Sequence, residues 1–278
     1  MINYFGNKII LRSIICIVLI INISCKNSSP KKDKIVSKEG MVFIPGGNFE
    51  MGGDNEEARS DEFPKHQVTV SSFWMDITEV TNAEFQKFVD ETGYITTAER
   101  KSDWDEIKKM LPPGTPKPHD SLLSPASLVF KETSTSNLND YSKWWSLIRN
   151  ANWKQPFGPQ SDIVGKDNYP VVHVSWEDAN EYCKWAGKRL PTEAEFEYAS
   201  RAGMINSVYS WGNEKVDEGM LKANTWEGEF PNQNNITDKF YYAAPVKSFK
   251  PNNYGLYDLA GNVWEWCLDW YHYDYYKT

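Results

Sequence analysis

The sequence predicts an α+β domain with little regular secondary structure, and three observations support this class. An early apolar segment and an alternating one indicate β-strands. Three later segments carry the capping residues and periodicity of short helices. Aromatic residues are abundant (12 Trp, 15 Tyr and 13 Phe), and their side chains bury large areas even where the backbone is irregular. The 278 residues suffice for one large domain or two small ones.

The composition is ordinary for a globular protein and does not suit nucleic-acid binding. Hydrophobic residues make up 40% of the chain and charged residues 24%. The formal net charge is -8 at pH 7, whereas a nucleic-acid partner requires a basic face. An acidic balance mainly serves solubility, and calcium sites would also use it. We therefore expect no nucleic-acid partner.

Residues 1–24 are predicted to be an export signal. Lys8 and Arg12 precede an apolar run, Ser13–Ile23, which is too short to span a bilayer as a helix. This order of a short basic start followed by an apolar run is typical of a secretory signal.

The predicted signal ends at Cys25. The preceding residues, Asn22-Ile23-Ser24, make a sequence similar to a bacterial lipoprotein cleavage box, which predicts lipidation of Cys25. A plain signal peptide with an incidental cysteine is the alternative. Residues 25–40, rich in Lys and Ser, are predicted to be a flexible tether. We therefore expect an exported protein held by a lipid anchor in the bacterial envelope, periplasmic or at the cell surface.

The segment after the tether is predicted to form strands. Met41–Met51 contains two apolar runs that flank Pro45-Gly46-Gly47, which predicts a hairpin. His66–Met75 alternates at its start, with Val68 and Val70 on one face, as expected of a half-buried strand.

Three helices are each marked by a capping box at the start and a glycine at the end. The capping pairs and glycines are Thr81, Glu84 and Gly93; Ser175, Asp178 and Gly187; and Thr192, Glu195 and Gly203. Local capping and apolar periodicity agree in all three segments, which predicts the helices strongly.

Between the first two helices, Ser102–Ile163 is predicted to be irregular. Leu111–Asp120 contains four prolines, which exclude a helix or a central strand there. The segment also contains Trp144, Trp145 and Trp153, which a disordered segment would rarely carry. We expect an ordered loop packed on the domain.

Two groups of oxygen-bearing residues near the C-terminal end are candidates for metal binding. Asn224 and Asp238 lie in a loop rich in turn residues, and calcium accepts carboxylate and amide oxygens in flexible geometry. Side chains that bond their own backbone in turns are the alternative. Asp258 and Glu265 flank Gly261-Asn262, next to tryptophans, where a buried carboxylate needs a partner or a metal. A surface salt bridge is the alternative there.

Several motifs together resemble the formylglycine-generating enzyme (sulfatase-modifying factor) family. The motifs are Asn224–Pro231 (NTWEGEFP), Asp238–Phe240 (DKF), Asn253–Trp266 (NYGLYDLAGNVWEW), Pro170–Trp176 (PVVHVSW), Gly187–Glu193 (GKRLPTE) and Tyr94–Arg100 (YITTAER). The resemblance covers roughly residues 41 to 271. It implies that residues 41–278 form a sulfatase-modifying-factor domain, related to the C-type-lectin-like core and incomplete at its C-terminus.

The resemblance also implies two structural calcium ions and one residue beside the active pocket. The calcium ligands would be oxygen atoms of eight residues in two sets. They are the side chains of Asn224 and Asp238 with the carbonyls of Thr225 and Phe240, and the side chains of Asp258 and Glu265 with the carbonyls of Gly261 and Val263. Trp264 corresponds to a tryptophan that borders the family's active pocket, with simple core packing as the alternative.

The chemistry that the resemblance implies is oxidation of a protein cysteine to formylglycine. The family uses molecular oxygen and copper(I) held by two cysteines, since thiolates are soft ligands, and its substrate is an unfolded sulfatase segment with the motif C-x-P-x-R. That cysteine pair follows an R-G-G-S-type stretch, which this sequence does not contain. Cys183 and Cys267 occupy other positions, so we expect no catalytic residue here and copper only in a complete member.

Two functions therefore stay open. The first is a formylglycine-generating oxidase that is inactive and unstable as this truncated chain. The second is a non-catalytic envelope lipoprotein that uses the same fold as a binding or scaffold module. The loop Trp153–Pro159 (WKQPFGP) favours the second, because generating enzymes often read W-R-H-P-E-G-P there.

Overall fold

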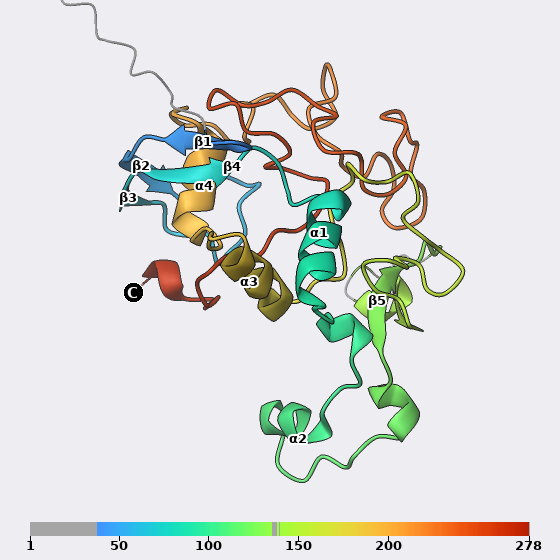
Figure 1. Ribbon diagram of the computed structural model, residues 1–278. Helices are drawn as coiled ribbons and strands as arrows, with labels where there is room; N and C mark the ends of the chain where they lie inside the picture. The colour runs from blue at the N-terminus through green and yellow to red at the C-terminus, as the bar shows by residue number, and fades with distance from the viewer. Residues whose placement is uncertain (1–37, 135–137, 139, 278) are drawn as a thin grey trace, which may run out of the picture. The chain divides into compact units, whose positions relative to one another are not determined.

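The computed structural model describes residues 38–134, 138 and 140–277, and within them the chain forms short helices and two-stranded sheets (Figure 1). The predicted export signal at residues 1–24, the lipidation site Cys25 and all but the last residues of the tether lie outside the described residues. Of the helices in the described part, none is both long and apolar enough to cross a membrane.

The N-terminal strands form one antiparallel ribbon in two pieces. They are β1 (Met41–Ile44), β2 (Gly47–Met51), β3 (His66–Val70) and β4 (Phe73–Asp76). β1 pairs with β4 and β2 pairs with β3. The same register runs through both pairs, because the chain advances by equal numbers of residues on the two arms, from Met41 to Met51 on one and from Asp76 to His66 on the other. The ladder is interrupted near Pro45, which has no N–H to donate.

The hairpin that we predicted within Met41–Met51 is wrong, because its two halves pair with β4 and β3 and not with each other. Pro45-Gly46 is a break in a long ribbon, not a turn. A Cβ atom on Gly46 would lie 2.7 Å from the nitrogen of Ser72 and the carbonyl oxygen of Val70, so the opposite strand requires glycine there. The predicted strand His66–Met75 is observed as β3 and β4, with Val70 buried.

All three helices that were predicted from capping boxes are present. They are α1 (Asn82–Thr92), α3 (Trp176–Trp185) and α4 (Glu193–Arg201), and each has both hydrogen bonds of its capping box. α1 ends at Gly93 in the left-handed conformation, as predicted. α4 ends one residue earlier than predicted, at Ala202, which takes the left-handed conformation before Gly203.

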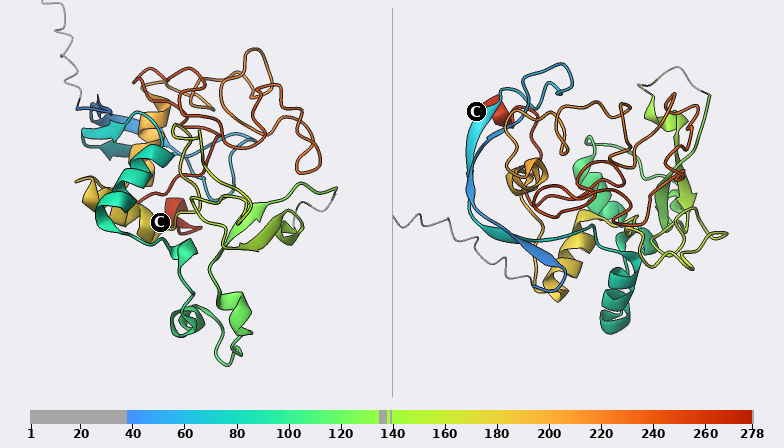
Figure 2. Two further views of the ribbon diagram at one scale, coloured as in Figure 1. Left: turned by 45° about the vertical axis from the view of Figure 1, so that its right-hand side comes forward. Right: turned by 90° about the horizontal axis from the view of Figure 1, so that it is seen from above.

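The helices pack around two apolar clusters. α1 and α3 share the first cluster, and α4 packs against β2 and β3 in the second. The buried members of the first are Phe85, Phe88, Trp153, Tyr182, Cys183 and Leu190, and those of the second are Ile44, Val70, Tyr198, Ala199 and Leu256. The ribbon curves past α4 in Figure 2, which places the second cluster between them.

The prediction that Ser102–Ile163 lacks regular structure is wrong in part. The segment contains a short helix, α2, and an antiparallel pair, β5 with β6. Their bounds are Trp104–Ile107 for α2, Ala126–Phe130 for β5 and Trp145–Arg149 for β6. The pair escaped prediction because no short turn motif joins its strands. The expected packing on the domain is observed, since Trp144 and Trp153 are buried.

The rest of the described chain has little regular structure, which confirms the α+β class with low regular content. The 3-10 helices are η1 (Thr97–Glu99), η2 (Lys108–Met110), η3 (Asp120–Leu123), η4 (Tyr141–Lys143) and η5 (Tyr275–Lys277). Between Ala202 and η5 the chain runs as loops and turns, drawn in orange and red in Figure 1.

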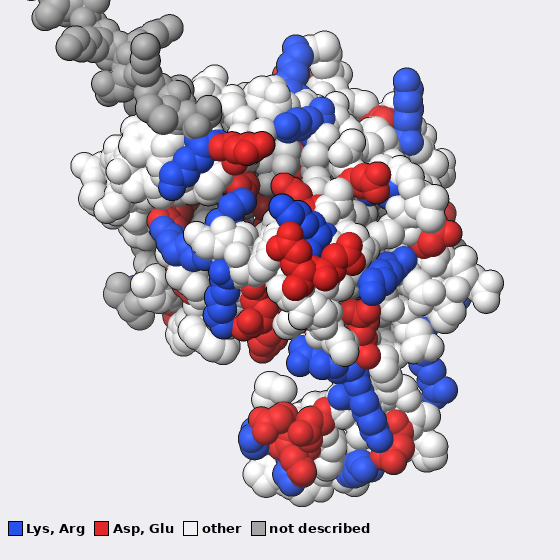
Figure 3. All heavy atoms as spheres, in the orientation of Figure 1, with Lys and Arg blue, Asp and Glu red and all other residues white. Residues whose placement is uncertain are grey.

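Acidic and basic side chains are interspersed on the face of the molecule shown in Figure 3. The pairs Lys108–Asp105 and Lys109–Glu106 illustrate this around α2, each at 2.6 Å. These pairs lie in water, where such contacts contribute little to stability.

Candidate functional site

The two predicted calcium sets meet where the loop at Asn224 touches the turn at Gly261. Asn262 N–H donates to the carbonyl oxygen of Asn224 at 2.8 Å, and Asn224 Nδ2 donates to Asn262 Oδ1 at 3.0 Å. Gly261 has φ +76, and a Cβ atom on it would lie 2.3 Å from Asn224 O. Glycine is therefore required both by the backbone conformation and by the approach of the other loop.

Glu79 is the buried acidic residue that our sequence analysis missed. Its side chain is 6% exposed, and its Oε1 accepts a hydrogen bond of 2.8 Å from Asn262 Nδ2. Its Oε2 is buried and has no hydrogen-bond partner among the described residues. Burial raises the pKa of Glu79 to about 7, with a further contribution from the negative charge of Asp258, while the Asn262 hydrogen bond opposes the rise.

Asp258 and Glu265, the predicted side-chain ligands of the second set, lie in the electrostatic reach of Glu79. Burial raises the pKa of Asp258, against the lowering effect of the hydrogen bond from Lys247 N–H to Oδ2 at 2.7 Å. The side chain of Glu265 reaches solvent along the wall of a cavity. The protein atoms around its carboxyl raise its pKa by desolvation, and the negative charges of Glu79 and Asp258 raise it further. Asp258 opposes the ionisation of Glu79 and of Glu265, and Glu79 opposes that of Glu265 but lowers the pKa of Asp258. Such a group of carboxyls is stabilised by a cation or by a retained proton.

The buried carboxylate of the first set is that of Asp238. Asp238 is 8% exposed, its Oδ1 accepts from Phe240 N–H at 2.8 Å, and its buried Oδ2 has no partner among the described residues. Burial raises the pKa of Asp238. Asn224, the other predicted side-chain ligand of this set, donates from Nδ2 to the carbonyl of Tyr242 at 2.8 Å. Its side-chain oxygen therefore stays available as an acceptor or a ligand.

Calcium fits the chemistry of these residues. The donors are carboxylate, amide and carbonyl oxygens, which calcium prefers, and two buried carboxylate oxygens lack a proton donor. Within the described residues no three His, Cys, Asp or Glu side chains converge as a ready ligand cluster. The eight-residue ligand assignment therefore stays a prediction.

A cavity of about 580 Å³ adjoins the second set. Glu79, Glu265 and Trp264 lie on its wall, and Trp264 is 91% exposed. The remaining wall is mainly apolar and comes from the ribbon, α3, the segments on both sides of α3 and the loop before Gly261. It includes Met41, Phe73, Met75, Val171, Cys183, Leu190 and Leu259. The ion pair of Lys188 with Asp76, at 2.7 Å, lies at the same cavity.

The two described cysteines do not fit a copper(I) site. Cys183 and Cys267 are free thiols, the first buried and the second half-buried. Burial and the charge of Asp76 raise the pKa of Cys183, which Lys188 opposes. Burial, with smaller contributions from nearby carboxylates, raises the pKa of Cys267 to about 12. A thiol must lose its proton to bind a soft metal or act as a nucleophile, so neither residue is suited to that role.

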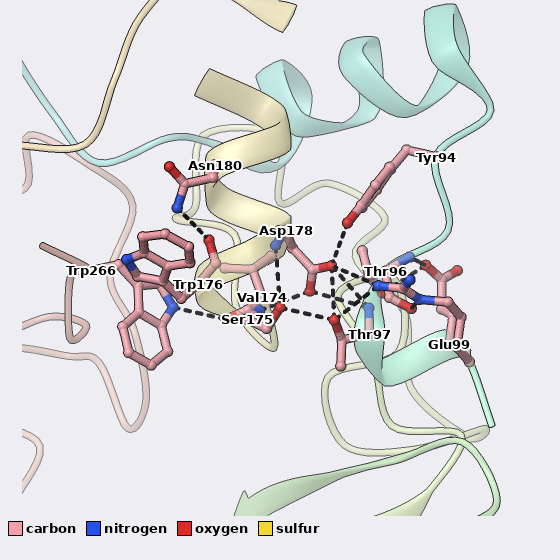
Figure 4. A network of polar contacts seen from close by, with 11 residues as sticks. Tyr94, Thr96, Thr97, Glu99, Val174, Ser175, Trp176, Asp178, Asn180 and Trp266 are labelled. Atoms are coloured by element: carbon pink, nitrogen blue, oxygen red, sulfur yellow. Dashed lines mark hydrogen bonds and ion pairs between the residues drawn. The ribbon is translucent and has the colours of Figure 1, made fainter. Parts of the chain in front are cut away.

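Asp178 organises the region beside the cavity, and our sequence analysis identified only its capping role. The carboxylate is fully buried and accepts from Ser175 N–H at 2.8 Å and Thr97 N–H at 2.9 Å (Figure 4). Tyr94 O–H donates to Oδ1 at 3.0 Å, and Arg100 lies 3.7 Å away. The motif at residues 94–100 is thereby fixed to the start of α3.

The same start of α3 holds the segment that carries Trp264. Trp266 Nε1 donates to the carbonyl of Val174 at 3.0 Å, as Figure 4 shows, and Trp176 Nε1 donates to the carbonyl of Cys267 at 2.9 Å. Residues 264–267 are therefore positioned by hydrogen bonds to the segment that Asp178 orders.

His173 joins β5 to the loop at Pro156. Its Nε2 lies 2.8 Å from the carbonyl oxygen of Pro156, and its Nδ1 lies 2.7 Å from Ser127 Oγ. A carbonyl only accepts, so Nε2 carries the hydrogen and Nδ1 of the neutral ring accepts from Ser127. Burial lowers the pKa of His173, which keeps this ring neutral. We assign the pair a structural role.

Comparison with known proteins agrees with these motifs. The family model described as the sulfatase-modifying factor enzyme 1-like domain matches residues 26–278. The chain is 45% identical over 232 residues to the formylglycine-generating enzyme of Mus musculus, covering 83% of this chain and 58% of that one. It is 43% identical over 251 residues to the formylglycine-generating enzyme of Thermomonospora curvata, covering 90% of this chain and 77% of that one.

Two further comparisons bear on fold and activity. The Bos taurus protein named inactive C-alpha-formylglycine-generating enzyme 2 is 42% identical over 232 residues, covering 83% of this chain and 71% of that one. The solved structure of PvdO from Pseudomonas aeruginosa has a TM-score of 0.55 and 25% identity, covering 86% of this chain and 73% of that one. The chain therefore belongs to the formylglycine-generating enzyme (sulfatase-modifying factor) family.

Proposed function

We propose that this chain is part of a formylglycine-generating protein, which acts on a cysteine in unfolded sulfatase segments of the form C-x-P-x-R. In the proposed reaction one Cβ–H bond and the Cβ–S bond of that cysteine break, one atom of molecular oxygen enters the aldehyde, and the sulfur leaves as hydrogen sulfide. A thiol reductant supplies the two electrons and two protons that reduce the other oxygen atom to water. The observation that carries the proposal is the 42–45% identity to relatives named formylglycine-generating enzyme over most of the chain. The chain spans 58% of the length of the mouse and bovine enzymes, so the activity is proposed for a whole protein.

We further propose that the 278 residues do not catalyse the oxidation by themselves. Bound copper would supply activation of oxygen, and its ligands in this family are two thiolates. Cys183 and Cys267 are poor thiolate sources for the reasons given above. What this chain contributes is the framework around the cavity and the segment that positions Trp264.

Calcium is proposed as a structural ion at both sets of oxygens. The support is the unpartnered Oδ2 of Asp238 in the first set and the unpartnered Oε2 of Glu79 beside the second. A cation at each place would neutralise buried negative charge that otherwise opposes folding.

A second function is a non-catalytic binding or scaffold module on the bacterial envelope. The Bos taurus and Mus musculus relatives named as inactive are 42% and 43% identical, close to the values for the relatives named as enzymes. In either case, the proposed location is the envelope, with export through residues 1–24 and a lipid on Cys25. Metabolic labelling with a fatty acid, compared between the natural chain and Cys25→Ala, tests the anchor.

The experiment that tests the oxidase proposal is a conversion assay. The purified chain is incubated with a C-x-P-x-R peptide, copper(I), oxygen, a thiol reductant and calcium, and mass spectrometry follows the aldehyde. The matched control peptide carries serine in place of cysteine. We expect no aldehyde from the 278 residues and conversion by a longer natural protein that contains them. Aldehyde formed by these 278 residues would overturn the proposed inactivity, and its absence from the longer protein would favour the scaffold function.

A further inference from the structure

The outer face of the N-terminal ribbon carries an aromatic pair near the start of the described chain. Side chains alternate along a strand, and Val42 and Ile44 pack in the cluster beneath α4, so Phe43 between them points outward. Trp74 lies directly opposite Phe43 on β4, and their ring centroids are 5.5 Å apart. Phe43 is 36% exposed and Trp74 is half-buried. Two aromatic rings therefore meet on the side of the ribbon that faces away from α4.

The other half of the ribbon has a polar outer face. Its outward pairs are Asn48 with Thr69 and Glu50 with Gln67, and all four residues are exposed. Thr69 Oγ1 donates to Asn48 Oδ1 at 2.7 Å, as expected where one face of an antiparallel sheet meets water. In the right-hand view of Figure 2, no described helix or strand lies outside the curve of the ribbon. The aromatic pair is therefore a local exception on a face that is otherwise polar.

Lys38 lies beside this pair, where the described chain begins. Its ammonium group is 5.6 Å from the centroid of the Trp74 ring, a cation–π contact, and its side chain is exposed. Tryptophan rings and long lysine side chains are suited to the boundary between hydrocarbon and water, because each combines an apolar body with a polar end. We call Lys38, Phe43 and Trp74 together the entry patch.

The chain length between the entry patch and the predicted lipid limits how far apart the two can be. Cys25 and Lys38 are thirteen positions apart in the sequence. A chain of that length spans about 45 Å when fully extended and roughly 20 Å on average when flexible. The entry patch is the surface of the described domain at which this connection ends. A lipid on Cys25 would therefore hold this patch close to the bilayer.

The charge of the tether favours the same contact. Residues 26–37 contain four lysines and one aspartate, a net charge of +3, whereas the whole chain has a net charge of -8. Basic residues next to a membrane anchor are attracted to anionic lipid headgroups, and acidic surfaces are repelled. The positive charge is thus concentrated on the connection that leads into the entry patch.

We propose that the entry patch is a membrane-contact surface, which places Phe43 and Trp74 in the headgroup region of an anionic bilayer beside the lipid on Cys25. The proposal rests on the proposed envelope location and adds the face of the domain that turns toward the membrane. The two rings leave water at the interface, and Lys38 pairs with lipid phosphates. A single acyl chain binds a membrane reversibly, so this second contact strengthens the attachment and orients the domain.

Vesicle binding without the acyl chain tests the inference. Residues 25–278 are prepared with Cys25→Ala and sedimented with vesicles of phosphatidylglycerol and phosphatidylethanolamine, or of phosphatidylcholine alone. We expect association with the anionic vesicles that weakens as the salt concentration rises. Phe43→Ser and Trp74→Ser should each weaken this association, and the double variant should weaken it on the order of tenfold, since two apolar side chains no longer leave water.

The controls separate the entry patch from other parts of the surface. Val164→Ser removes an apolar side chain that is 84% exposed and lies outside the patch, so it should leave vesicle binding unchanged. Lys31→Gln with Lys32→Gln should reduce the salt dependence and leave the effect of Phe43→Ser in place. Thermal melts check that each variant is folded, and Phe43→Ser keeps the test decisive if Trp74→Ser does not fold.

The orientation is tested on the natural, acylated protein. Hydroxyl-radical oxidation, located by mass spectrometry, is compared between protein on phosphatidylglycerol vesicles and the Cys25→Ala protein in solution. Oxidation of Phe43 and Trp74 should fall several-fold on vesicles, whereas oxidation of Val164 should not change.

Three results would overturn the inference. They are no association with anionic vesicles, equal association by the natural patch and both aromatic variants, or sedimentation showing a dimer that Phe43→Ser dissociates, which would identify a second copy as the occupant. The proposed anchor fails separately. No fatty acid on Cys25, with vesicle binding that still depends on Phe43, would remove the anchor alone. A lipid on Cys25, with equal oxidation of Phe43 on and off vesicles, would remove the inference alone.

Discussion

The side-chain amide of Asn262 donates a hydrogen bond of 2.8 Å to the buried carboxylate of Glu79, which lies 183 residues earlier in the chain. This bond joins the segment before α1 to the turn at Gly261, where the loops of the two predicted calcium sets meet. It leaves one oxygen of Glu79 without a partner, beside two further carboxyls.

Calcium is expected to raise the unfolding temperature of the chain. A ligand that binds only the folded state stabilises it by about 2.7 kcal/mol at a hundredfold excess over its Kd. Asp238→Asn should reduce this gain, since Asp238 supplies a buried oxygen without a partner. Differential scanning fluorimetry with calcium and with EDTA measures the effect. Asp217→Asn, at an exposed acidic position, is the control. If calcium does not change the unfolding temperature of the natural chain, the prediction of both calcium sets is wrong.

Gly261→Ala is expected to destabilise the fold more than Gly165→Ala. Both glycines have positive φ, +76 and +74, so both substitutions introduce backbone strain of about 1 kcal/mol. Only at Gly261 would the new Cβ collide with another loop, 2.3 Å from Asn224 O, whereas nothing lies within 4 Å at Gly165. Urea unfolding of the two variants isolates the cost of the collision. Equal costs would show that the two loops are not in contact.

Asp178→Ala is expected to cost about 3 kcal/mol, because it removes a fully buried carboxylate and leaves the N–H groups of Ser175 and Thr97 without this acceptor. Asp90→Ala, at an exposed position on α1, is the matched control and should cost under about 0.5 kcal/mol. The environment of Trp266 should also change, since its hydrogen bond partner is next to Ser175. Denaturant unfolding and near-ultraviolet circular dichroism measure the two effects, and similar values for both variants would contradict the assigned role.

Tryptophan substitutions should separate core from surface. Trp153 is fully buried, so Trp153→Ala is expected to cost about 3–5 kcal/mol. Trp264 is 91% exposed, so Trp264→Ala should change stability by less than about 0.5 kcal/mol. Guanidinium unfolding of the two variants measures this, and a large cost at Trp264 would favour the alternative of simple core packing.

The stability of the fold should depend on pH through His173. Burial lowers its pKa below the ordinary 6.5, so just below that pH the unfolded chain binds more protons than the folded chain. The contribution of His173 to stability should therefore grow as the pH rises toward 6.5 and should be lost as the pH falls through its folded pKa. Glu79, whose pKa is raised to about 7, contributes the opposite slope in the natural chain and in His173→Gln alike, so the difference between the two isolates His173. Urea midpoints between pH 5 and pH 7 provide the measurement, and an unchanged slope in the variant would contradict the prediction.

Local signals predicted local structure correctly. The capping boxes at Thr81, Ser175 and Thr192 identified three helices because each signal and the backbone it satisfies lie within one turn. The hairpin at Pro45-Gly46 failed for a related reason, since a Pro-Gly pair is compatible both with a turn and with a break in a longer ribbon. Only the opposite strand, which lies more than twenty residues away, distinguishes the two.

Long-range contacts were not predictable from one sequence. Glu79 meets Asn262, and Asp178 meets Thr97, through separations of 183 and 81 residues that no periodicity encodes. The pair β5 and β6 was missed because residues 131–144 join its strands without a turn motif. Asp258 and Glu265 could be proposed as a site because they lie only seven positions apart in the chain.

The unbroken register of the N-terminal ribbon limits how its length can change. Met41–Ile44 and Gly47–Met51 pair with the opposite arm in the same register. Deleting a single residue at Gly46 would therefore shift one of the two stretches by one position and move its buried side chains to the other face of the ribbon. Either Ile44 or Phe49 would then leave the cluster beneath α4. Shortening or lengthening of this ribbon is therefore tolerated only when both arms change together, by the same number of residues at facing positions.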